Sequence, residues 1–165
     1  MARSRPIAYL VTLRTFGTWL HGDARGSHDC LHRTYGTPPL AHRPRLEAVE
    51  RHRARVPPQL LDARSRTIVE RVASDVCDYR CWQLLAVNAR TNHVHLVVAA
   101  DSEPEVVALS LKSWITRKLV EAGALPKNVP LWSRHASTVY LWTVRSRDRA
   151  MHYVMHEQDV EPERI

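Results

Sequence analysis

The residues best suited to chemistry are two histidines, His93 and His95, separated by one valine. The surrounding segment, NHVHLVV at 92–98, has the β-branched and apolar composition of a strand. Successive side chains on a strand point to opposite faces, so the two imidazoles share one face and the apolar residues share the other. Two neighbouring imidazoles form part of a metal site that needs a further ligand. The alternative is a pair of polar residues on the solvent-facing side of a sheet.

A second group of reactive side chains lies near the C-terminus, in a segment with helical character. Tyr153 and Glu157 are four residues apart and so share a helix face, and Gln158 follows directly. If this helix packs on the histidine face, the site gains a phenol and a carboxylate or amide oxygen. Mixed nitrogen and oxygen ligands bind Mg²⁺ or Mn²⁺ less tightly than an all-oxygen site does, and manganese is the better match to imidazole. The alternative is that Tyr153 is a half-buried packing residue.

Hydrophobic periodicity places these residues in an α+β domain. The sequence predicts strands over 7–15, 82–88, 93–99 and 138–142, and helices over 62–79, 102–123 and 146–158. Ser102 and Glu105 have the spacing of a capping box at the start of the second long helix, and Gly123 marks its end. The order corresponds to a ferredoxin-like βαββαβ antiparallel sheet with an extra C-terminal helix that carries the tyrosine. Its two crossover helices would cover one face and leave the histidine face open.

Length, charge and cysteine content limit the classes of protein to which this chain could belong. The 165 residues fit one domain, 1–165, in which roughly 38–58 is predicted to be a surface insertion. A net charge of +7 and a pI near 9.8 favour a polyanionic partner such as nucleic acid. Three cysteines argue against a disulfide framework, and we expect Cys77 and Cys81 to be buried thiols. The sequence shows neither a membrane span nor the apolar run of a signal peptide, which predicts a cytoplasmic protein with no membrane partner.

Taken together, these motifs resemble the single-tyrosine HUH nucleases. The similarity rests on the histidine segment 92–98 and on the helical Tyr153-Val154 that precedes Gln158. More narrowly, the chain resembles the single-strand insertion-sequence transposases and the REP-associated tyrosine transposases, with which it shares the segment TFGTWLHGDARGS at 15–27. With the Lys112-Ser113-Trp114 helix, the resemblance spans nearly the whole chain.

This resemblance implies a definite chemistry. In the family, the two histidines and an amide on the tyrosine helix hold a divalent metal, and the tyrosine attacks a phosphodiester of single-stranded DNA. A covalent 5′-phosphotyrosine forms and a 3′ hydroxyl is released. Carried over, Tyr153, His93 and His95 are catalytic, and Mg²⁺ or Mn²⁺ is the cofactor. The third ligand is Gln158 or Glu157, because relatives place it four residues beyond the tyrosine while the amide here lies five beyond.

The expected partner is single-stranded DNA that contains a hairpin. Basic residues would hold its backbone and tryptophans would stack on unpaired bases. The candidates for these contacts are Arg14, Trp19, Arg25, Lys112, Arg117, Lys118, Trp132 and Arg134. Both a monomer and a homodimer are compatible with the sequence. Two other functions are compatible with it as well: a domesticated, non-catalytic nucleic-acid-binding protein, and a small metallohydrolase that activates water at the histidines.

Overall fold

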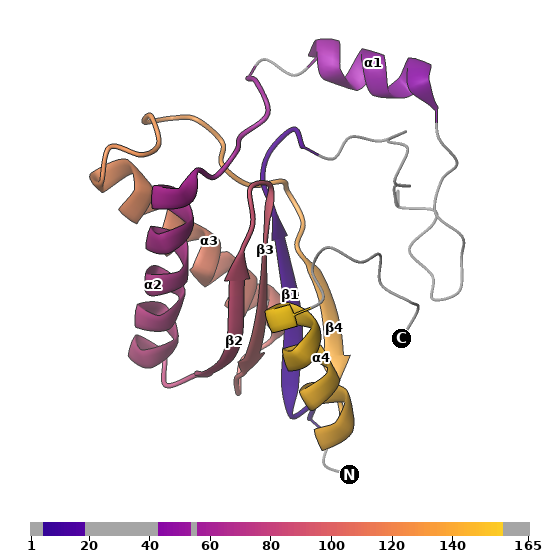
Figure 1. Cartoon of the computed structure of the whole chain (residues 1–165), viewed down its shortest axis with the longest axis vertical. Coiled ribbons are helices and arrows are strands. Elements are labelled where there is room, and N and C mark those ends of the chain that lie inside the picture. The colour runs from indigo at the N-terminus through magenta and orange to yellow at the C-terminus, as the bar shows by residue number, and fades with distance from the viewer. Residues whose placement is uncertain (1–4, 19–42, 54–55, 157–165) are drawn as a thin grey trace.

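The computed structural model describes residues 5–18, 43–53 and 56–156 (Figure 1). The strands are β1 (Ala8–Arg14), β2 (Gln83–Ala89), β3 (His93–Ala99) and β4 (Ser137–Leu141). The helices are α1 (Pro44–Arg53), α2 (Ala63–Tyr79), α3 (Pro104–Glu121) and α4 (Val144–His156). Each predicted strand and helix is present with shifts of one or two residues at its ends, within the part of the chain described.

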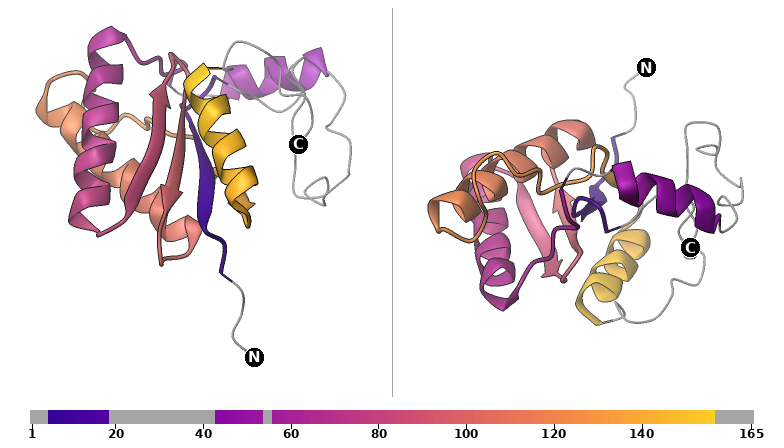
Figure 2. Two further views of the ribbon diagram at one scale, coloured as in Figure 1. Left: turned by 60° about the horizontal axis from the view of Figure 1, so that its bottom comes forward. Right: turned by 90° about the horizontal axis from the view of Figure 1, so that it is seen from above.

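The strands form one antiparallel sheet in the order β2-β3-β1-β4. Strands β3 and β1 are central, and the β2–β3 hairpin turns through Arg90, whose N–H donates to the His93 carbonyl at 2.8 Å. Helices α2 and α3 pack on one face of the sheet, and α4 lies on the other (Figures 1 and 2). This arrangement confirms the ferredoxin-like βαββαβ fold with an added C-terminal helix.

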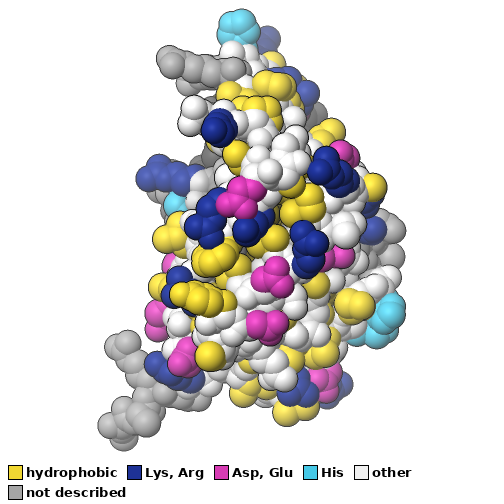
Figure 3. All heavy atoms as spheres, turned by 90° about the vertical axis from the view of Figure 1, so that its left-hand side faces the viewer, with side chains coloured by type: hydrophobic (Ala, Val, Ile, Leu, Met, Phe, Trp, Pro, Cys, Tyr) yellow, Lys and Arg dark blue, Asp and Glu magenta, His cyan; other side chains and the backbone are white. Residues whose placement is uncertain are grey.

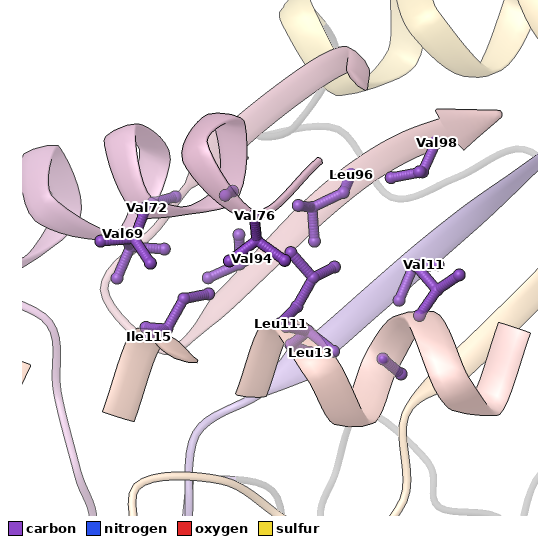
Figure 4. Packing of buried hydrophobic residues seen from close by; sticks show 14 of the residues in the cluster. Val11, Leu13, Val69, Val72, Val76, Val94, Leu96, Val98, Leu111 and Ile115 are labelled. Carbon is purple, nitrogen blue, oxygen red and sulfur yellow. The ribbon is translucent and has the colours of Figure 1, made fainter. Parts of the chain in front are cut away.

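Alternation along the strands separates two apolar clusters. The larger cluster fills the space between the sheet and helices α2 and α3 (Figure 4). Its members in that view are Val11, Leu13, Val69, Val72, Val76, Val94, Leu96, Val98, Leu111 and Ile115. The smaller cluster lies under α4 on the opposite face, where Leu10 and Val97 meet Ala150 and Val154. As predicted, the apolar residues of β3 next to the histidines face the crossover helices.

Helix α2 begins at a side-chain cap, and a left-handed residue follows its C-cap, Arg80. The Asp62 carboxylate accepts a hydrogen bond from the Ser65 N–H at 2.7 Å, which satisfies one of the unpaired donors at the helix start. Beyond the helix, Cys81 has φ +57° and its side chain is exposed. The prediction that both thiols are buried is therefore confirmed for Cys77, which lies within α2, and wrong for Cys81, which lies in the connection between α2 and β2.

The predicted capping box at α3 is also wrong. The helix starts at Pro104, which makes Glu103 its N-cap, and no side chain caps it. Proline favours the first helical position because its missing N–H would be unpaired there in any case. Ser102 therefore lies one residue too early to cap the helix. At the other end, Gly123 has φ +69°, as expected of a glycine that follows a helix.

Helix α1 falls within the predicted insertion 38–58 and lies to one side of the sheet in every ribbon view (Figures 1 and 2). Residues 38–42 and 54–55 of that segment lie outside the described residues. No helix in the described parts of the chain is long and apolar enough to cross a membrane.

Two leucines on α3 test how the core is divided. Leu111 is fully buried in the larger cluster, whereas Leu109 is 67 % exposed. Leu111→Ala should lower the free energy of unfolding by about 2–5 kcal/mol because it leaves a cavity. Leu109→Ala makes the same change in helix propensity as Leu111→Ala. Because Leu109 is exposed, the variant should lower the free energy of unfolding by less than about 0.5 kcal/mol. Urea unfolding of both variants checks this, and equal losses would show that α3 is packed differently.

Candidate active site

Both candidate histidines lie on the face of β3 that α4 covers. His95 pairs with Thr12 of β1 and with Asn88 of β2, so the three side chains form a polar row across the sheet. His93 pairs with Arg14 at the end of β1. The side-chain alternation of a strand therefore places both imidazoles together, as predicted.

Each imidazole is oriented by a hydrogen bond at Nδ1. His95 Nδ1 is 2.8 Å from Thr12 Oγ1, and His93 Nδ1 is 2.7 Å from Asn92 Oδ1. The ring centroids of the two histidines are 4.7 Å apart at an interplanar angle of 73°. Ligand histidines in metal sites are commonly oriented in this way, with one nitrogen bonded to a polar group and the other on the metal. The Nε2 atoms are consequently the ones suited to a metal.

His95 is more deeply buried than the sequence predicts. The histidine face is not open, because α4 packs against it and leaves His95 only 9 % exposed. Burial lowers the pKa of His95 to about 3, with smaller contributions from the charges of His93, Arg14 and Arg90. His95 is therefore neutral throughout the physiological range, the state in which imidazole binds a metal.

Helix α4 is capped at its start and held on the sheet by residues of its second half. At its start, the Ser146 N–H donates to Thr143 Oγ1 and the Thr143 N–H interacts with Ser146 Oγ, both at 3.1 Å, a reciprocal cap of the kind predicted for α3. Ala150 and Val154 are buried against the sheet. Near the helix end, Asn88 Nδ2 donates to the Val154 carbonyl at 3.1 Å. These contacts set which residues of the helix face the histidines.

Tyr153 is one of the residues that face them. Its ring centroid lies 5.5 Å from that of His95, in an edge-to-face arrangement with an interplanar angle of 70°. Another tyrosine, Tyr140, pairs with Tyr9 across β1 and β4 and so lies on the opposite face of the sheet. Of these two phenols, only Tyr153 lies with the histidine pair.

The described residues place two imidazoles together, without a third histidine, cysteine or carboxylate beside them. No group of three histidine, cysteine, aspartate or glutamate side chains within them could hold a metal ion. Glu157 and Gln158, the candidates for the third ligand, lie outside the described residues, so that prediction stays open. The two neutral, hydrogen-bonded imidazoles fit a divalent ion as a partial coordination sphere, which other oxygen ligands would complete.

Two arginines add positive charge beside the histidines. Arg14 lies across from His93, and both Arg14 and Arg90 act electrostatically on His95. A phosphate group would be attracted to this end of the sheet. Sequence reasoning found Arg14 but missed Arg90, although its place in the turn before the histidine strand was a usable signal. Thr12 and Asn88 were also missed, because their importance depends on strand register.

The basic residues of α3 lie elsewhere. This helix packs on the face of the sheet opposite the histidines, and Figure 3 shows basic and acidic side chains interspersed on the side where α2 and α3 lie. Lys112 Nζ donates to the Ser133 carbonyl at 2.8 Å, and burial lowers its pKa. Lys118 pairs with Glu121 at 2.7 Å. The Arg117 guanidinium lies over Trp114, 4.2 Å from the ring centroid. The structure therefore does not bring these three residues together with the histidines.

The predicted stacking residues have different surroundings. Trp132 is partly buried on the same side as α3, where its indole N–H donates to Thr116 Oγ1 at 3.0 Å. Arg134 is exposed in the connection that follows. Trp19 and Arg25 lie outside the described residues. Contacts between these four residues and DNA stay predictions.

Comparisons with known proteins agree with the fold. No protein-family model and no curated protein matches the sequence of this chain. One solved structure with a similar fold is a presumed transposase from Deinococcus radiodurans R1, with a TM-score of 0.53 and 12 % identity over 95 % of each chain. Another is a REP-associated tyrosine transposase bound to a REP hairpin, with a TM-score of 0.52 and 9 % identity over 94 % of this chain and 68 % of that one.

The burial of His95 predicts a specific dependence on pH. The imidazole of the unfolded chain takes up a proton near pH 6.5, whereas that of the folded chain does so only near pH 3. The contribution of neutral His95 to the free energy of unfolding is thus fully present above about pH 6.5 and decreases as the pH drops toward 3. In NMR spectra the His95 ring resonances should not titrate between pH 8 and 5. A titration midpoint near 6.5 would contradict the burial of this ring.

Proposed function

We propose that this protein is a transposase-like endonuclease and strand-transferase that acts on single-stranded DNA and forms a covalent 5′-phosphotyrosine. The observation that carries the proposal is the contact between Tyr153 and His95, on a face that also holds His93 and is close enough to Arg14 and Arg90 for their charges to act on His95. A phenol, two oriented imidazoles and nearby positive charge are the components that phosphodiester transfer to tyrosine requires. Two transposases with a similar fold support the transposase-like part of this proposal.

In the proposed reaction, Tyr153 Oη attacks the phosphorus of one phosphodiester. A bond forms between Oη and phosphorus, and the bond from phosphorus to the 3′ oxygen breaks. The phenol loses its proton and the departing 3′ oxygen gains one, so the exchange is balanced without an external energy source. The phosphodiester energy is kept in the phosphotyrosine, which makes transfer to another 3′ hydroxyl feasible.

His93 and His95 would hold a divalent cation, Mg²⁺ or Mn²⁺, together with Gln158 or Glu157. Such an ion, when bound, would supply polarisation of the scissile phosphate. Thr12 and Asn92 would keep the imidazoles oriented, since each bonds the Nδ1 of its histidine. Arg14 and Arg90 would attract the DNA backbone to this end of the sheet.

The proposed substrate is a single strand beside a hairpin. A duplex would hold its backbone away from a tyrosine that packs on a sheet unless bases were first extruded, at a cost of a few kcal/mol each. The similar transposase bound to a REP hairpin supports a structured substrate. The contact between Tyr153 and His95 of one chain favours a site built from a single subunit, although a homodimer with one site per chain is compatible with it.

Removal of the phenolic oxygen tests the proposed nucleophile. Tyr153→Phe keeps the aromatic contact with His95, so folding should survive while the covalent adduct with a labelled single strand disappears. Tyr140→Phe, on the opposite face of the sheet, should form the adduct as the parent does. Denaturing gels of the protein–DNA product measure both variants.

Three outcomes would contradict this proposal. An adduct that persists in Tyr153→Phe would assign the chemistry to another residue. Faster cutting of the same sequence as a blunt duplex would indicate an ordinary duplex nuclease. Binding of a single strand without an adduct from the unmodified chain would instead favour the alternative function, a non-catalytic nucleic-acid-binding protein.

The proposed cation is tested through His93, which is less buried than His95. His93→Ala should abolish adduct formation in Mg²⁺ or Mn²⁺ while circular dichroism shows an intact fold. EDTA should have the same effect on the unmodified chain, and added Mn²⁺ should restore the adduct. Full activity in EDTA would refute a metal-dependent reaction.

A further inference from the structure

The outer side of α4 carries three metal-binding side chains that the proposed reaction does not use. His152, Met155 and His156 are all exposed, and Met155 is 54 % exposed. Met155 lies three residues and His156 four residues beyond His152, so both are neighbours of His152 on the exposed side of the helix. The two imidazole rings lie 4.8 Å apart between centroids, at an interplanar angle of 48°.

This face is distinct from the candidate active site. Ala150 and Val154 are buried against the sheet, and Tyr153 packs against His95. His152 and His156 therefore flank Tyr153 in the sequence but lie on the exposed side of the helix. Met155 is also exposed and belongs to neither of the two apolar clusters formed by the described residues.

The donor set determines which ion would bind. Two histidines four residues apart on a helix are a recurring chelating pair for transition metals. A thioether is a soft ligand that favours Cu(I), whereas imidazole also accepts Zn²⁺ and Ni²⁺. The three residues occupy the last turns of α4, where the negative end of the helix dipole favours a cation.

We propose that His152, Met155 and His156 form a binding site for copper(I). The ion would be coordinated by two imidazole nitrogens and one thioether sulfur, at a site that is exposed to solvent. Because the ligands bridge one turn, a bound ion would hold together the end of the helix that presents Tyr153. Copper binding does not depend on the proposed DNA chemistry and is measured without DNA.

Competition with a chromophoric copper(I) chelator under anaerobic conditions tests the site. The chain should bind one copper(I) ion tightly, and His152→Ala or His156→Ala should weaken binding by about tenfold or more. Met155→Leu should weaken copper(I) binding but leave Ni²⁺ binding within about twofold, because nickel has less preference for sulfur. Met151→Leu, a matched change at a partly buried methionine on the sheet side, should have no effect.

The controls separate this site from the histidine pair of β3. His93→Ala should leave the copper(I) affinity unchanged. Loss of copper(I) binding in His93→Ala, or an unchanged affinity in the double variant His152→Ala, His156→Ala, would overturn the proposal. Equal copper(I) affinities for the parent and Met155→Leu would overturn the assignment of sulfur as a ligand.

Discussion

The position of β3 in the middle of the sheet constrains the rest of the molecule. Its backbone is hydrogen-bonded to β1 on one side and β2 on the other, and both of its faces are covered. A shift of register by one residue would turn Val94 and Leu96 toward α4 and both histidines into the apolar core. Burying two imidazoles there without partners would be costly, so the alternation of β3 selects one register for the whole sheet.

The same alternation explains why so much of the fold could be predicted from the sequence. Apolar residues at helical or strand spacing identified each element that packs on the sheet, and the valine–histidine alternation of β3 assigned the faces correctly. The sequence rules for helix capping were less successful at the starts of α3 and α4. Pro104 set the start of α3 in place of Ser102, while Thr143 and Ser146 formed a reciprocal cap without the glutamate that the search pattern requires.

The candidate site was harder to predict because it is assembled across strands. Sequence spacing found the two histidines and Tyr153, but it could not find Thr12, which lies 83 positions from His95 and bonds it only because of the strand register.

Net charge was a poorer guide to the location of the site. Net charge counts the basic residues without assigning a face, and Lys112, Arg117 and Lys118 proved to lie on the side of the sheet away from the histidines.

The two apolar clusters on opposite faces of the sheet also bear on how such proteins diverge. Most of the buried apolar side chains lie between the sheet and helices α2 and α3, while the histidines and Tyr153 lie beneath α4. Substitutions that repack the larger cluster can accumulate without touching the reactive groups, provided that volume and alternation are kept. Sequence change on one face of the sheet therefore need not alter the other, which is consistent with a fold shared by chains that are only 9–12 % identical to this one.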